Sequence, residues 1–140
     1  MLTLQAVILT AGMIGAAVYD IRNRLVDDRV CWLIALAGLV TISPASFWAQ
    51  LLGFFCAGLP FYLGSGFGKN GAGDIWLAAS AGFVLGIQRT IAGLTLFVVV
   101  YSIFVALYSL FLWCIHRPTP KSYPLVPFIT AGFLPAYFLI

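Results

Sequence analysis

Two aspartates, Asp20 and Asp74, are the residues whose type and setting could support chemistry. Asp20 closes the first apolar stretch of the chain, and Asp74 opens a later one within the sequence NGAGDIW. A carboxylate at the edge of an apolar segment is costly to bury and is a functional candidate by default. Two carboxylates brought close together cannot both ionise easily, so the pair shares a proton. One can then activate a water while the other polarises a peptide carbonyl and later protonates the leaving amine, as in aspartic proteases.

Two glycines precede Asp74, at Gly71 and Gly73. Glycine lets backbone approach closely and permits a positive φ. Such an approach would admit an extended substrate strand to Asp74. A protease needs an extended substrate, because a helix engages its peptide groups in its own hydrogen bonds.

The composition indicates an integral membrane protein with a single all-α domain over residues 1–140. Hydrophobic residues make up 63% of the 140 residues and charged residues 8%, whereas a soluble domain carries about 25% charged residues. The net charge of +3 is too small and too dispersed to suggest a nucleic-acid partner. The three cysteines are far apart and form no CxxC pair, so no zinc or redox site is expected. No motif for another metal or cofactor is found.

Apolar runs predict about six transmembrane helices. We expect them near residues 2–19, 30–42, 47–63, 74–87, 91–115 and 124–140. A crossing needs about 20 residues, so the second and fourth runs are short. No basic side chain precedes the first run, which we interpret as a helix of the mature protein rather than a signal peptide.

The basic residues predict the orientation. Six of the seven Lys and Arg residues lie in the loops after the first, third and fifth spans: Arg22, Arg24, Arg29, Lys69, Arg117 and Lys121. Arg89 lies on the other side. The positive-inside rule then places these three loops in the cytoplasm and both termini outside it. Asp20 and Asp74 would lie at matched depth on the cytoplasmic side.

Small residues are expected to pack the helices of the two aspartates directly together. They are Gly15, Ala16 and Ala17 before Asp20, and Ala78, Ala79 and Ala81 after Asp74. Small faces let helix backbones approach closely.

Each aspartate also has a structural interpretation. Asp74 at a helix start is a good N-terminal cap. Asp20 could pair with Arg24, four residues on. Asp28 could cap the second helix.

Three segments together resemble the type IV prepilin peptidases. The stretch GAGDIWLAASAGFVLG, residues 71–86, contains the GxGD motif of intramembrane-type aspartyl proteases and is similar to the second catalytic segment of that family. YDIRNRLVDD, residues 19–28, resembles the first segment, and YPLVPFITAGF, residues 123–133, resembles the last-span motif, which includes Pro127. The short chain is most similar to the tight-adherence (Tad/Flp) type.

The resemblance implies an aspartic endopeptidase of the inner membrane that removes the basic leader from type IV pilin-like precursors on the cytoplasmic side. It assigns the catalytic pair to Asp20 and Asp74. Nearby Asp27 and Asp28 are expected to attract the basic leader. Arg22, Arg24 and Arg29 are expected to fix the topology and contact anionic membrane lipid.

The sequence departs from the family pattern in three places. Val26, Asp27 and Asp28 stand where Ile-Pro-Asn or Ile-Pro-Asp is frequent, and Trp76 stands where Lys is common. Long members also N-methylate the trimmed pilin and carry a cysteine-rich loop. The corresponding loop here has no cysteine pair, so methylation is not expected.

Two further hypotheses stay open. The chain could be a non-enzymatic membrane scaffold or transporter subunit whose aspartates cap helices or relay protons. It could also be a GxGD protease that acts on other membrane proteins. The oligomeric state has no sequence marker.

Overall fold

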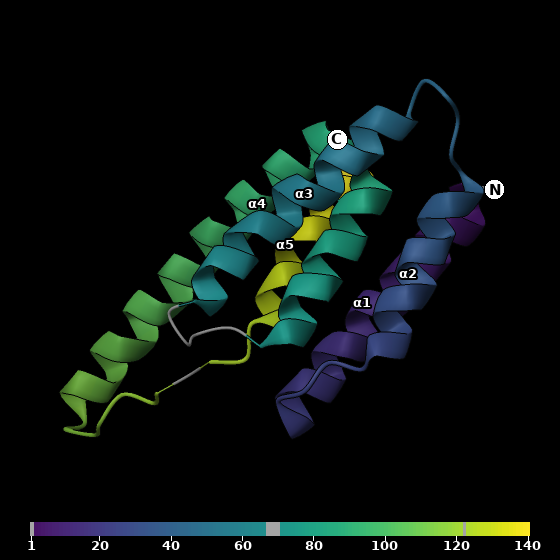
Figure 1. Cartoon of the computed structure of the whole chain (residues 1–140). Coiled ribbons are helices and arrows are strands. Elements are labelled where there is room, and N and C mark those ends of the chain that lie inside the picture. The colour runs from purple at the N-terminus through teal and green to yellow at the C-terminus, as the bar shows by residue number, and fades with distance from the viewer. Residues whose placement is uncertain (1, 67–70, 122) are drawn as a thin grey trace.

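The computed structural model describes residues 2–66, 71–121 and 123–140, whose regular secondary structure is entirely helical (Figure 1). The helical elements are α1 (Leu2–Asn23), α2 (Asp28–Val40), α3 (Phe47–Ser65), α4 (Ala72–Cys114) and α5 (Val126–Leu139). These ranges contain no strand, so the predicted all-α class is confirmed.

Three of these helices are long and apolar enough to cross a membrane: α1 from Thr3 onward, α3 and α4. The length and apolar composition of these helices indicate a membrane protein. The helices α2 and α5 have 13 and 14 residues, fewer than the about 20 of a full crossing. The predicted count of six spans is not confirmed, because three elements of the described residues are long and apolar enough to cross. The fourth and fifth predicted spans both fall within α4, which has 43 residues.

The α4 element is broken at Gly86. Its φ of 73° and ψ of 170° lie outside the helical region, and glycine adopts a positive φ without the steric cost that a Cβ brings. Thr90 Oγ1 donates a hydrogen bond to the Gly82 carbonyl at 3.2 Å, although eight residues would span about 12 Å along a straight helix. Figure 1 shows the two arms, teal and then green, running in opposite directions. Residues 72–85 and 87–114 are thus separate arms, close to the boundary predicted between the fourth and fifth spans.

Glycines bring α3 against the first arm of α4. A Cβ added to either Gly53 or Gly82 would collide with the carbonyl oxygen of the other residue. The second arm also contacts α3, since the Phe61 and Phe97 rings lie 5.2 Å apart. Side chains from several helices fill the core, and the most deeply buried include Leu9, Met13, Ile34, Leu77, Ile129 and Phe133.

The predicted direct packing of the two aspartate-bearing helices is wrong. The extensive contacts of α1 are with α2 and α5, and those of α4 are with α3, α5 and α2. Gly15 has open space where a Cβ would stand, while Ala79 lies against Gly58 of α3. Ala79 of α4 therefore packs against α3 rather than α1.

The two ends of the helix bundle carry different polar groups. Figure 1 shows both chain termini at one end, which we call the distal end. The last turn of α1 and the first turns of α2, α4 and α5 lie at the opposite end. We call this second end the carboxylate end, because α1 and α4 bring Asp20 and Asp74 there.

A side-chain network ties four helices together at the distal end. Gln5 Nε2 donates to Thr41 Oγ1 at 3.0 Å, and the Tyr137 hydroxyl donates to Gln5 Oε1 at 3.4 Å. The Arg89 guanidinium carbon lies 5.6 Å from the centre of the Tyr137 ring, within the range of a cation–π interaction. We call Gln5, Thr41, Arg89 and Tyr137 the distal network; it joins α1, α2, α4 and α5.

Candidate active site

Asp20 lies in the last turn of α1 and is buried, with 6% of its surface exposed. Its Oδ2 accepts a hydrogen bond at 3.2 Å from the backbone N–H of Val126, the first residue of α5. The first N–H groups of a helix lack intrahelical acceptors and form the positive end of its dipole. The start of α5 is therefore a favourable place for a carboxylate. The charge of Arg24 also acts on Asp20, in keeping with the predicted pairing.

Pro127 stands in the first turn of α5. Proline suits this position because its fixed φ matches the helix and its missing N–H would have had no intrahelical acceptor. The residue before it, Val126, provides the donor to Asp20. Pro127 thus stands at the helix start that holds this carboxylate.

Asp74 is the third residue of α4 and is half-buried. Its Oδ2 accepts from the Gly71 N–H at 3.3 Å, while its own N–H donates to the Gly71 carbonyl at 3.2 Å. This reciprocal pair is a helix cap, so the structural interpretation of Asp74 has a geometric basis. A cap occupies part of the capacity of a carboxylate, which has two oxygens with about four acceptor sites.

The two carboxylates come from different helices and lie within electrostatic reach of each other. The charge of Asp20 acts on Asp74. Direct packing of α1 on α4 does not produce this arrangement. Instead α2 and α5 each contact both α1 and α4, so two intervening helices hold the pair in register.

The two glycines before Asp74 do not use the positive φ that glycine permits. Gly71 has a φ of −82°, and Gly86 is the glycine with positive φ in the described ranges. A Cβ on Gly73 would stand 2.7 Å from Val26 Cβ, whereas one on Gly71 would meet only Asp74 Oδ2, at 3.9 Å. Gly73 is therefore required by the close approach of the loop that follows Asp20.

Asp27, rather than Asp28, caps α2. Asp27 has an extended backbone, with φ −78° and ψ 121°, and its Oδ1 accepts from the Arg29 N–H at 3.0 Å. A cap residue needs this extended conformation, and Asp28 already belongs to the helix. The predicted cap at Asp28 is wrong, and its exposed carboxylate faces a cavity instead.

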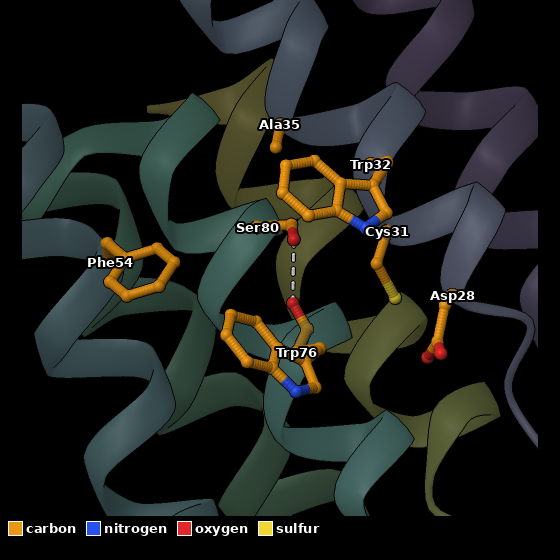
Figure 2. Close-up of a pocket in the computed structure, with 7 residues that line it drawn as sticks. All are labelled: Asp28, Cys31, Trp32, Ala35, Phe54, Trp76 and Ser80. Carbon is orange, nitrogen blue, oxygen red and sulfur yellow. Dashed lines mark hydrogen bonds between the residues drawn. The ribbon is translucent and has the colours of Figure 1, made fainter.

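That cavity has a volume of about 450 Å³ and lies between α2, α3 and the first arm of α4 (Figure 2). Its lining comprises Asp28, Cys31, Trp32, Ala35, Phe54, Trp76 and Ser80. The charges of Asp28 and Asp74 both act on the Cys31 thiol. Trp76, which lines the cavity, stands two residues after Asp74 on α4.

Two residues that shape the site were not selected from the sequence, Val126 and Val26. Val126 acts through its backbone N–H, for which a side chain gives no signal, although the neighbouring proline marks a helix start. Val26 acts by its proximity to Gly73, which depends on the path of the loop after α1. Both contacts join residues that are far apart in the sequence, so they can be identified only from the folded structure.

The comparisons with known proteins identify one family. The family model described as the type IV leader peptidase family matches residues 7–115, a range that includes both Asp20 and Asp74 and ends before α5. The curated proteins and the solved structures gave no match.

Proposed function

Because the chain belongs to the type IV leader peptidase family, we propose that it is an aspartic endopeptidase that cleaves type IV prepilin-like precursors. Family membership supports a leader-peptidase-like protease. The proposal adds a catalytic pair, Asp20 and Asp74, and a substrate that carries a short basic leader. One observation carries the aspartic mechanism: two carboxylates from distant parts of the chain, in the last turn of α1 and the first turn of α4, come to the same end of the bundle (Figure 1), where the charge of Asp20 acts on Asp74.

The proposed reaction begins with one aspartate ionised and the other protonated. The ionised carboxylate takes a proton from water as the water oxygen bonds to the carbonyl carbon, and the protonated one gives its proton to the carbonyl oxygen. The C–N bond of the resulting diol then breaks. The nitrogen takes a proton from the first aspartate, and a diol hydroxyl returns one to the second. The pair ends with the single proton it held at the start.

The charges around the carboxylate end support a basic leader as the substrate. Asp27 and Asp28 follow the loop after α1 and are exposed. Their carboxylates attract a positively charged leader, whereas Arg22, Arg24 and Arg29 repel it and are better partners for anionic lipid. We therefore propose that the reaction occurs on the side of the membrane that the loop between α1 and α2 faces.

We further propose that the protein is a multi-pass inner-membrane protein with the carboxylate end in the cytoplasm and both termini outside. Lys69, one of the basic residues behind this orientation, lies outside the described residues. Single cysteines introduced at Lys121 and Ser43, in a variant without the three native cysteines, test it in intact cells. An impermeant thiol reagent should label residue 43 and leave residue 121 unlabelled, and the reverse pattern would overturn the orientation.

The helix cap at Asp74 supports the second candidate, a non-enzymatic role. Co-expression with a pilin-type precursor separates the two by a mobility shift of the precursor. Asparagine caps a helix as well as aspartate does, so a cap tolerates Asp74→Asn. We expect Asp20→Asn and Asp74→Asn each to abolish cleavage while the protein accumulates normally in the membrane. Substantial cleavage by Asp74→Asn would refute the aspartic mechanism.

A further inference from the structure

We propose that the cavity between α2, α3 and the first arm of α4 binds the apolar segment that follows the leader in the precursor. This inference rests on the function proposed above and assigns the part of the protein that recognises the rest of the substrate. We call the cavity the Trp32–Trp76 groove, defined by the seven lining residues given above.

The groove is open to the outside and mainly apolar. Trp32 on α2 and Trp76 on α4 keep 69% and 56% of their surfaces exposed, and Figure 2 shows Phe54 of α3 on a further side. The Ser80 hydroxyl donates to the Trp76 carbonyl at 2.7 Å within α4, so it does not require a partner from an occupant. The volume of about 450 Å³ falls within the range of about 300–1,000 Å³ that is typical of binding clefts.

The groove is acidic at one end only. Asp28 is the charged residue of the lining, and the others named are apolar, aromatic or small. A complementary occupant has an apolar stretch with a positive charge at one end. A precursor in which a basic leader directly precedes an apolar segment has this order.

The lining of the groove comes close in sequence to Asp74, one member of the proposed catalytic pair. Trp76 is two residues beyond Asp74 on the same arm of α4, and the charges of Asp28 and Asp74 both act on Cys31. We place the basic leader of the precursor at Asp28 and its apolar side chains between Trp32 and Trp76. The junction between leader and apolar segment then lies near the proposed catalytic carboxylates. That junction is the bond the proposed protease must cut.

A second apolar cavity provides a matched control. It has a volume of about 420 Å³ and lies between α1 and α5, lined by Ala6, Val7, Thr10, Ala11 and Phe138. None of these residues is charged. A lipid chain could occupy either cavity, and tryptophan is common at the membrane interface for that reason alone. If lipid alone fills both cavities, substitutions at Ala35 and Ala11 should affect cleavage alike. If the groove binds substrate, the substitution at Ala35 should have the larger effect.

The experiment compares two substrates in membranes or detergent. One is a pilin-type precursor with its apolar segment, and the other is a soluble peptide that holds only the leader and the residues around the cleavage site. Ala35→Phe fills the groove and should raise KM for the precursor about tenfold or more, as expected from the loss of about 1.4 kcal/mol of binding. Its KM for the short peptide, and both KM values of Ala11→Phe, should stay within about twofold of wild type. Equal KM effects on the two substrates, or no effect on either, would overturn the inference.

Photocrosslinking provides a second measurement in case Ala35→Phe fails to fold. Benzoylphenylalanine replaces Trp32 in one protein and Val7 in another, each in the Asp74→Asn background to retain the precursor. Crosslinks to the apolar segment from position 32 but not from position 7 support the inference, whereas crosslinks from position 32 to lipid alone overturn it. If wild type cleaves neither substrate, the proposed function fails. The crosslinks still test binding in the groove in that case, because they do not require turnover.

Discussion

The carboxylate end and the distal end of the bundle both place polar groups among apolar helices, but their partners differ. In the distal network, side chains contact side chains: Gln5 bridges Thr41 and Tyr137, and Arg89 covers the Tyr137 ring. At the carboxylate end, Asp20 and Asp74 accept from backbone N–H groups at the starts of α5 and α4. Backbone donors at a helix start fix the position of a carboxylate and favour its charge. The comparison indicates that side-chain contacts join the helices at the distal end, while backbone N–H groups hold two carboxylates in place at the carboxylate end.

The largest expected difference between the ends is in turnover. Asp20→Asn or Asp74→Asn should each lower kcat by at least about 10³-fold, because residues that act as a unit lose nearly all catalysis when one is removed. Gln5→Leu and Tyr137→Phe should leave kcat within about threefold of wild type, since the distal network takes no part in the proposed reaction. Cleavage of a pilin-type precursor in isolated membranes measures both. A distal variant as inactive as the aspartate variants would erase the distinction.

The next effect tests how closely the loop after α1 must approach α4. Gly73→Val should lower kcat by about 10²-fold, since a displacement of about 1 Å at a catalytic group can cost that much. The added Cβ would collide with Val26, whereas Gly71→Ala has room for its Cβ and should be nearly neutral. Gly73→Ala should be partly rescued by Val26→Gly, which removes the opposing Cβ. Failure of this rescue would mean that Gly73 acts by another route.

A smaller effect is expected from the acidic residues at the start of α2. The double variant Asp27→Asn with Asp28→Asn should raise KM for a basic precursor about fivefold and leave kcat nearly unchanged, because exposed charge pairs contribute about 1 kcal/mol or less. Asn retains the α2 cap, so folding should be preserved. Asp28→Asn alone should account for most of the change, since Asp27 is engaged in the cap. An unchanged KM would remove both residues from substrate binding.

The smallest effect concerns stability at the distal end. Gln5→Leu removes the side-chain bridge from α1 to α2 and α5. We expect a loss of about 0.6 kcal/mol in the free energy of unfolding, the average for hydrogen bonds between membrane helices. Thermal unfolding in detergent, compared with the exposed-site control Val7→Leu, measures it. A stability equal to that of the control would show that the network contributes no net stability.

The sequence was sufficient for the features that depend on local pattern. The apolar runs predicted the helices, and the boundary near residue 87 was found because Gly86 and its polar neighbours interrupt the apolar pattern. The pairing of Asp20 with Asp74 came from charge distribution and a family resemblance. Their identity as catalytic residues stays a prediction.

The features that were missed depend on long-range packing. Periodicity and small-residue content do not specify a partner, so the expected packing of the small residues of α4 on α1 is wrong, and Ala79 lies against α3. The choice between Asp27 and Asp28 as the cap depended on one pair of backbone angles. The donor to Asp20 was invisible because it is a main-chain group more than one hundred residues away.

The order of the helices along the chain has a consequence for how the protein is made. Asp20 lies in α1, Asp74 in the first arm of α4, and the N–H donor to Asp20 at the start of α5. During synthesis the ribosome releases these elements in that order, so the first aspartate enters the membrane long before its partners exist. The proposed site is complete only when α5 has docked. The growing chain therefore has no assembled carboxylate pair until Val126 has been synthesised, and a truncated product that ends before Val126 would lack the group that holds Asp20.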